Sequence, residues 1–200
     1  MKKVADHLNL SKPVRTLELN EAEKEALKPY SFLTGKKVLY AANISEADLP
    51  HMENEFVQKV RAFAEAEGNS VIAICAKLEE EIAQLPSDER ALFLESLGLK
   101  QSGLQRLIRS SFDMLDLITF LTTGDMESRA WTIKKGTNAY DAAEKIHTDI
   151  QKGFVRAEVI SYDDFVAFKG RPGAKENGKM RFEGRDYIVK DGDVIIFMHH

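Results

Sequence analysis

The 200-residue sequence predicts an α/β fold in which a parallel sheet with helices is followed by a small β-grasp domain. Two short apolar runs, residues 37–42 and 70–75, flank a segment of helical periodicity. This order is typical of a right-handed β-α-β unit with parallel strands. From about Leu117 the hydrophobic period changes, and short runs separated by turn residues follow. The change of period predicts a second domain.

The first 30 residues are polar and helix-prone around residues 21–27, with too few large apolar side chains to form a core. After Pro50 a helix is expected, because apolar residues recur at helical spacing as far as Gly68, a glycine suited to a helix C-terminus. The apolar positions of this helix are Met52, Phe56, Val60, Phe63 and Ala64.

Two further helices are expected before the change of period. Ser87 is placed to cap a short helix that ends near Gly98. Ser102 and Gln105 have the spacing of a capping box, in which each side chain bonds the backbone of the other residue. The first domain therefore contains both strands and helices.

The second domain is predicted to have the order ββαβββ, which suits a β-grasp fold. The first two strands, residues 119–123 and 129–133, flank a hairpin turn at Gly124 and Asp125. A helix is expected over residues 139–150. The remaining strands are expected at residues 154–160, 180–183, 187–189 and 194–197.

Composition excludes several classes of protein. With 28 basic and 32 acidic residues the net charge is −4, so bulk attraction to nucleic acid is excluded and any RNA contact must be local. Cys75 is the only cysteine, which excludes an intrachain disulfide and a thiol zinc site, and fits a reducing, cytoplasmic setting. Neither a long apolar run nor a signal-peptide pattern is present, so no membrane association is expected.

Candidate binding residues follow the two predicted strands of the first domain. Asn43 and Cys75 lie at the carboxyl ends of parallel strands, where ligands of α/β sheets bind. An Asn side chain can pair with the N6 and N7 edge of adenine, and backbone amides of the loop at Cys75 can close such a pocket. Asn and Glu three residues apart are common in unrelated chains. The motif therefore indicates a base site only because of its position at the end of a strand.

Residues 36–46, Lys-Lys-Val-Leu-Tyr-Ala-Ala-Asn-Ile-Ser-Glu, resemble the base-recognition strand of the YchF (Obg-like) ATPase family. That family has Asn-x-x-Glu where typical GTPases have Asn-Lys-x-Asp, and residues 75–79 resemble its second base-contacting loop. The resemblance implies a purine nucleotide as ligand, with ATP preferred over GTP. The base-binding residues that it implies are Asn43, Ile44, Glu46, Cys75 and Ala76.

The second domain resembles the TGS domain of the same family in three segments, residues 129–133, 146–160 and 187–194. The resemblance thus extends over nearly the whole chain. It implies that the complete protein hydrolyses ATP and associates with the ribosome or structured RNA. It divides the chain into residues 1–30, the end of a helical coiled-coil insertion, residues 31–116, part of the nucleotide-binding domain, and residues 117–200, the TGS domain.

One family element is missing from the sequence. No Gly-x-x-x-x-Gly-Lys-Ser/Thr motif occurs, so the loop that cradles phosphates and the hydroxyl that holds Mg²⁺ are absent. The fold expected is therefore an incomplete P-loop-type sheet, in a chain that begins inside the insertion. Mg²⁺ is expected only in a full-length protein, and this chain alone is expected to be inactive as an ATPase.

A local basic patch in the second domain is the candidate RNA contact. Its residues are Lys134, Lys135, Lys169, Arg171, Lys175 and Lys179. The segment 169–179 is also consistent with a solvated connection, and the run 79–81 of glutamates with a solvated helix face. His147 is interpreted as a structural or helix-terminal residue and Trp131 as a core or half-core residue.

Two other functions are consistent with the sequence. In the first of them, the chain is a non-catalytic module that binds RNA or protein through its second domain, and the first domain serves only as support. A small acid-base enzyme using His147 with Asp149 or Asp163 is disfavoured, because no nucleophile, base and orienting group fall together. Nucleotide affinity distinguishes the first two hypotheses.

Overall fold

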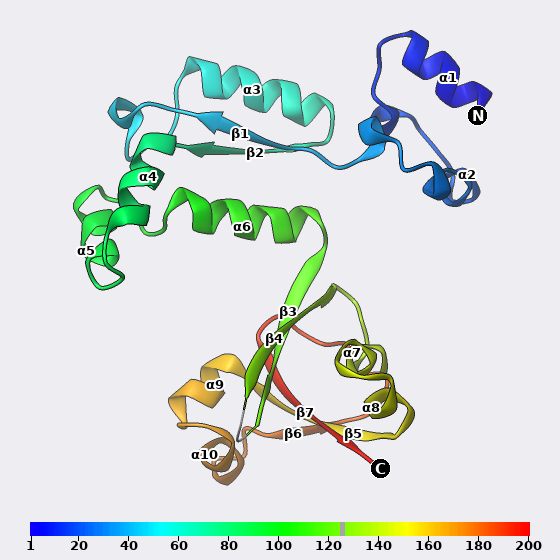
Figure 1. The fold of residues 1–200 in the computed structure, drawn as a ribbon, viewed down its shortest axis with the longest axis vertical. Coiled ribbons are helices and arrows are strands. Elements are labelled where there is room, and N and C mark those ends of the chain that lie inside the picture. Colours follow the sequence, from blue (N-terminus) through cyan, green and yellow to red (C-terminus); the bar gives the residue numbers. More distant parts are fainter. Residues whose placement is uncertain (125–126) are drawn as a thin grey trace. The chain divides into compact units, whose positions relative to one another are not determined.

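The computed structural model describes residues 1–124 and 127–200, so Asp125 of the predicted hairpin turn lies outside the described residues. The chain forms two compact units, Met1–Leu115 and Asp116–His200. Figure 1 shows the elements of each unit. The predicted fold class is confirmed, since the first unit contains a parallel sheet with helices and the second a mixed sheet with helices.

The sheet of the first unit consists of two parallel strands, β1 (Leu39–Asn43) and β2 (Ser70–Ile74). They pair in register from Leu39 opposite Ser70 to Asn43 opposite Ile74. The connection between them contains α3 (Glu55–Ala66), and α6 (Gly103–Met114) lies on the other side of the strands (Figure 1). The predicted β-α-β unit is therefore confirmed.

The buried face of α3 differs from the predicted one. Val57 and Ala64 are its buried residues, at 2% and 0% exposure, whereas Phe56 and Phe63 are 66% and 56% exposed. The apolar stripe of this helix is wider than the surface that it covers, and periodicity alone could not tell which of two adjacent apolar residues faces the sheet. Asn54 caps the helix, and Gly68 follows its end with φ of +69°.

The remaining helices of the first unit are short. They are α1 (Lys2–Asn9), α2 (Glu21–Leu27), α4 (Ala76–Gln84) and α5 (Glu89–Ser96), with 3-10 turns at Val14–Thr16, Lys28–Tyr30, Leu33–Gly35 and Glu46–Asp48. Asn20 and Glu23 form a capping box at the start of α2. The prediction that Ser87 caps α5 was wrong, because the helix begins one residue later and its N-cap position is Asp88.

The start of α6 is held by two sets of acceptors. Ser102 and Gln105 form the predicted capping box. The carboxylate of Glu79 also accepts hydrogen bonds from the backbone amides of Gly103 (2.5 Å) and Leu104 (3.0 Å). A Cβ at Gly103 would lie 2.7 Å from Oε1 of Glu79, which explains why glycine occupies this position. Glu79 is thus a helix-capping residue of α6, and its interpretation as part of a solvated face was wrong.

The second unit has a five-stranded sheet of order β4-β3-β7-β5-β6, the arrangement of a β-grasp fold. Its strands are β3 (Leu117–Thr123), β4 (Ser128–Lys134), β5 (Phe154–Ser161), β6 (Arg181–Glu183) and β7 (Asp193–His199). β3 pairs parallel with β7, and the other pairs are antiparallel. The core includes Phe120, Val159 and Ile195, all fully buried.

The predicted single helix over residues 139–150 was wrong. The chain forms α7 (Ala139–Ile146) and α8 (Thr148–Lys152), separated by His147, whose backbone is extended. The imidazole Nδ1 of His147 accepts a hydrogen bond from the amide of Asp149 at 3.2 Å, so it caps α8. The helix-terminal interpretation of His147 is confirmed.

The predicted strand at residues 187–189 was also wrong, since Ile188 makes only an isolated bridge to Asn138. Tyr187 instead donates its hydroxyl to the buried carboxylate of Asp193 at 2.8 Å. Burial, together with this hydrogen bond, raises the pKa of Tyr187. Trp131 is half-buried against the core and donates to the hydroxyl of Thr122 at 2.8 Å.

The connection after β5 contains two short helices, α9 (Tyr162–Ala167) and α10 (Arg171–Glu176). Most of residues 169–179 are exposed, as predicted for a solvated connection, but the helix α10 was not predicted. Gly170 turns the chain with φ of +106°, and Ala174 is fully buried. A Cβ at Gly173 would lie 2.0 Å from the carbonyl oxygen of Phe168, so the two helices can pack this closely only with glycine at that position.

Candidate nucleotide-base site

The two loops predicted to form the base site are joined directly. Oδ1 of Asn43, at the end of β1, accepts a hydrogen bond from the backbone amide of Ala76 at 3.0 Å. Ala76 is the first residue of α4, which follows β2. The parallel pairing that places Asn43 opposite Ile74 brings both loops to one edge of the sheet. Asn43 is exposed, so its amide group can reach a ligand.

A second link joins the same loops. Nζ of Lys77 lies 2.8 Å from Oε1 of Glu46, and both side chains are largely exposed, at 72% and 50%. The hydrogen bond that Lys77 donates to Glu46 raises the pKa of Lys77. Glu46 belongs to a 3-10 turn that begins after Ser45, where Ser45 and Asp48 form a capping box. Lys77 is a residue that the site prediction did not include, although it belongs to the motif that supports that prediction.

Two of the five predicted base-binding residues point their side chains inward. Ile44 and Cys75 are 6% and 4% exposed, and both belong to the core of this unit. Only their backbone groups can contact a ligand, and the amide of Ile44 already donates to the carbonyl of Ile74 at 2.8 Å. The interpretation of Cys75 as a packing residue is confirmed.

The side chains at the site suit a purine base better than a metal ion. An amide side chain with two N–H donors lies at the sheet edge, where it can pair with adenine. In the described part of the chain, no three His, Cys, Asp or Glu side chains gather so as to hold a metal ion. The residues present therefore fit the base of ATP or GTP but supply no ligand set for Mg²⁺.

The six candidate RNA-contacting residues lie in two groups. Lys134 ends β4, opposite Leu117 at the start of β3, and Lys135 follows it. The other four residues belong to α10 or its flanks, and they are Lys169, Arg171, Lys175 and Lys179. The second group is contiguous along the chain and lies on one short helix with its two ends.

Two members of the α10 group are engaged within the unit. Arg171 donates from Nη2 to the carboxylate of Glu158, which is only 5% exposed. The ammonium of Lys179 lies 3.5 Å from the carboxylate of Asp164. A hydrogen bond from Ser161 and the charge of Lys179 lower the pKa of Asp164. Arg171 therefore balances a buried charge, and its replacement would affect folding as well as binding.

Comparisons with known proteins show which family this chain resembles. A family model described as "YchF-GTPase_C: Protein of unknown function (DUF933)" matches residues 117–200.

No helix within residues 1–124 and 127–200 is both long and apolar enough to cross a bilayer.

Relatives match nearly the whole chain. A protein of Pasteurella multocida named "Ribosome-binding ATPase YchF" is 47% identical over 197 residues, which is 98% of this chain and 54% of the relative. A protein of the same name from Bacillus subtilis is 45% identical over 198 residues, again 98% and 54%. The chain spans about half the length of the curated relatives it matches.

A solved structure described as the Schizosaccharomyces pombe YchF GTPase superposes with a TM-score of 0.80 at 30% identity. The match covers 98% of this chain and 53% of the other one.

Proposed function

Because the chain belongs to the YchF family, as the resemblance of its motifs predicted, we propose that it carries the purine-base site and the RNA-contacting unit of an ATP-hydrolysing protein. The relatives are named ribosome-binding ATPases. In this proposal the phosphate-binding loop and the Mg²⁺ ligands come from a part of the full-length protein outside this sequence. Residues 1–30, 31–116 and 117–200 correspond to the end of a helical insertion, the base-recognition part and the TGS domain.

The position of Asn43 is the observation that supports the base site best. Its Oδ1 carries two lone pairs, of which the amide of Ala76 occupies one. One lone pair and two N–H donors remain. Adenine offers a donor at N6 and an acceptor at N7, so a bidentate contact with Asn43 is still available when the two loops are linked.

Glu46 supports the preference for adenine. In the guanine-specific motif an Asp accepts hydrogen bonds from guanine, and its replacement by the longer Glu removes a well-fitted guanine reader. Here the carboxylate of Glu46 is also paired with Lys77. Ile44, Cys75 and Ala76 complete the proposed site through their backbone.

The C-terminal unit is proposed to contact ribosomal or other structured RNA. Supporting observations are the names of the relatives and the concentration of basic residues on α10 and its flanks. The unit has 13 basic and 13 acidic residues over 117–200, so binding depends on a local patch. Within that patch Lys169 and Lys175 are better candidates for phosphate contact than Arg171, whose charge is matched by Glu158.

The base site is tested by titrating the chain with adenosine and guanosine while recording amide chemical shifts. We expect adenosine to bind more tightly and to shift the Ala76 amide. Tighter binding of guanosine would overturn the adenine preference. Shifts confined to residues outside the loops at Asn43 and Ala76 would overturn the site.

The alternative function, a binding module without a nucleotide site, requires that neither nucleoside binds while RNA does. The same preparation titrated with ribosomal RNA separates the two proposals, because the first predicts binding of both ligands.

A further inference from the structure

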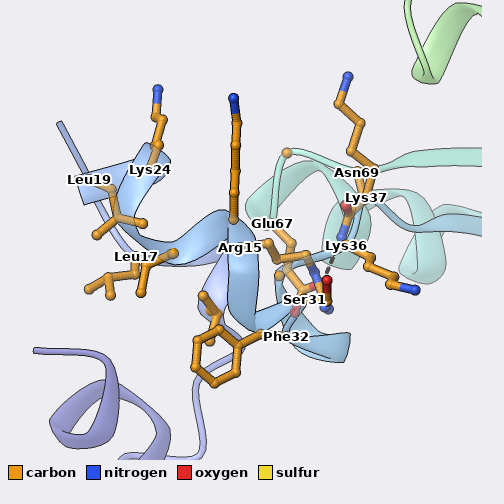
Figure 2. A pocket seen from close by; sticks show the side chains of 15 residues that line it. Arg15, Leu17, Leu19, Lys24, Ser31, Phe32, Lys36, Lys37, Glu67 and Asn69 are labelled. Atoms are coloured by element: carbon orange, nitrogen blue, oxygen red, sulfur yellow. Dashed lines mark hydrogen bonds and ion pairs between the residues drawn. The ribbon is translucent and has the colours of Figure 1, made fainter. Parts of the chain in front are cut away.

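A pocket of about 560 Å³ lies between the first 37 residues and the end of α3, and Asn43 is not among the residues that line it. Its volume is within the range of about 300 to 1,000 Å³ that small-molecule sites occupy. Figure 2 shows the pocket from close by. No part of the base site or of the basic patch on α10 contributes to its lining, so it is a separate feature of the first unit.

The lining of this pocket is strongly basic. It includes five cationic residues, Arg15, Lys24, Lys28, Lys36 and Lys37, and a single carboxylate, Glu67. Five positive charges and one negative charge leave a lining charge of +4, although the whole chain carries −4. The local sign is therefore opposite to the global one, and it favours an anionic ligand.

The one carboxylate in the lining is fully engaged. Glu67 accepts hydrogen bonds from Nη2 of Arg15 (2.8 Å), the hydroxyl of Tyr40 (3.0 Å) and Nδ2 of Asn69 (2.8 Å). The hydrogen bond from Arg15 is the main reason that the pKa of Glu67 is lowered. Glu67 and Arg15 thus balance each other, and the lysines set the charge of the pocket.

Three of the four lysines, Lys24, Lys28 and Lys36, can reorient towards a ligand at little energetic cost. Lys24 pairs with Glu21 and Lys28 with Glu25, three residues apart on exposed helical turns. Exposed pairs of this kind contribute little and exchange readily with other anions. Lys36 is exposed as well.

The lining of the pocket also contains apolar residues and an aromatic ring. These residues are Leu17, Leu19, Leu27 and Phe32. In Figure 2 the side chains of Lys24 and Lys37 extend to one side, and Leu17 and Phe32 lie on the other. The ring of Phe32 stacks on that of Tyr30, with centroids 5.9 Å apart and an interplanar angle of 19°. An aromatic surface beside several lysines is the combination by which proteins bind unpaired nucleotides.

We propose that this pocket binds a nucleotide of a single-stranded RNA segment, with its base against Phe32 and neighbouring phosphates on Lys24, Lys28 and Lys36. Bases of a duplex are stacked and paired, so only an unpaired segment can place a base in the pocket. A single phosphate would leave the apolar side unused, and an acidic peptide would leave the aromatic ring without a planar partner. The inference rests on the proposed function only in that RNA is the partner, since the site itself is distinct.

The test uses the whole chain and a short fluorescent oligouridylate or oligoadenylate strand, with anisotropy measured at several salt concentrations. Changing Lys24, Lys28 and Lys36 together to Gln should weaken binding and reduce the salt slope by about 2, because each lost phosphate contact to a single strand contributes about 0.7. A matched control changes three exposed lysines elsewhere in the unit, Lys12, Lys59 and Lys100, to Gln and should keep the slope. Equal losses in the two triple variants would refute the site.

The base contact is tested separately with Phe32→Leu, which keeps an apolar side chain but removes the ring. Affinity for the single strand should fall about tenfold, the scale of one lost base stack. Circular dichroism and thermal melting confirm that the variant is folded, and Leu33→Ala, at an adjacent residue that is 80% exposed, is the control. Unchanged affinity in folded Phe32→Leu would overturn the proposal.

Three further outcomes decide the identity of the ligand. Duplex RNA that binds as tightly as the single strand, or AMP or polyglutamate that displaces it at equal monomer concentration, would overturn the proposal. If RNA binding is instead lost with Lys169 and Lys175 and not with the pocket lysines, this inference fails while the proposed function stands.

Discussion

Asn43 has two separable roles in the proposed site, and two substitutions distinguish them. Its Oδ1 accepts from the amide of Ala76 at 3.0 Å and has a lone pair left for N6 of adenine, whereas its N–H group is the only donor for N7. Asn43→Asp keeps an acceptor for Ala76 and removes both donors. Asn43→Ala removes the acceptor as well. The Asp variant should therefore lose base affinity with its loops still joined.

The magnitudes follow from the two contacts. Loss of a bidentate base contact costs about 1 to 3 kcal/mol, which weakens binding roughly 5- to 150-fold. The loop contact is a neutral hydrogen bond, worth about 0.5 to 1.5 kcal/mol. Because Ala76 is exposed, its amide can bond water in the Ala variant, so the lower end of that range applies. Both variants should fold, and the Ala variant should bind only slightly less well than the Asp variant.

Binding is measured by titration of the chain with adenosine, and by titration of the full-length protein with ATP. Hydrogen exchange at Ala76 reports the loop contact, and it should accelerate in Asn43→Ala but not in Asn43→Asp. Asn9→Asp, at an exposed position in α1, makes the same chemical change as a control. Wild-type affinity in Asn43→Asp would refute the base contact, and fast exchange in that variant would refute the loop contact.

Three further outcomes are expected. Glu79→Ala should destabilise the first unit by about 1 to 2 kcal/mol in urea unfolding, because two amides at the start of α6 lose their acceptor. The control, Glu80→Ala at an exposed neighbouring residue, should change the stability little. The chain alone should release no phosphate from ATP or GTP above the background of a mock purification, since it lacks the phosphate-binding motif. Steady turnover that co-purifies with the chain would contradict this prediction. Substitution of both Lys169 and Lys175 by Glu should weaken binding to ribosomal RNA and lower the salt slope of binding by about 2, without loss of protein stability. An unchanged slope would mean that the RNA contact lies elsewhere.

The elements that the sequence predicts well are those defined by local chemistry. The run that ends at Asn43 and the capping box of Ser102 and Gln105 are local signals, and both occur in the structure. The wrong predictions concern competition between local and distant contacts. His147 interrupts a helical pattern because its ring caps the next helix. Residues 187–189 have the sequence pattern of a strand, but the hydroxyl of Tyr187 bonds the carboxylate of Asp193.

The candidate site shows the same limit. Spacing could place Asn43 and Cys75 at one sheet edge, because parallel strands end together. It could not show that Asn43 bonds Ala76 or that Lys77 pairs with Glu46, since both contacts join residues more than 30 positions apart in sequence. The basic pocket beside α3 was missed for the same reason, as its lysines are scattered over residues 24–37 among acidic neighbours.

The pair of Glu46 and Lys77 is too weak to account for a strong preference between purines. Reading guanine would require the carboxylate of Glu46 to turn from Lys77 towards the base, which costs the energy of this pair. Its partners are 50% and 72% exposed, and exposed pairs contribute about 0 to 1 kcal/mol. One kcal/mol corresponds to about a fivefold change in affinity. Lys77→Met should therefore alter the ratio of guanosine to adenosine affinity by no more than about fivefold, measured in the same nucleoside titration. A larger change would mean that Lys77 itself contacts the ligand, and a smaller one assigns the selectivity to the length of Glu46 and to the amide of Asn43.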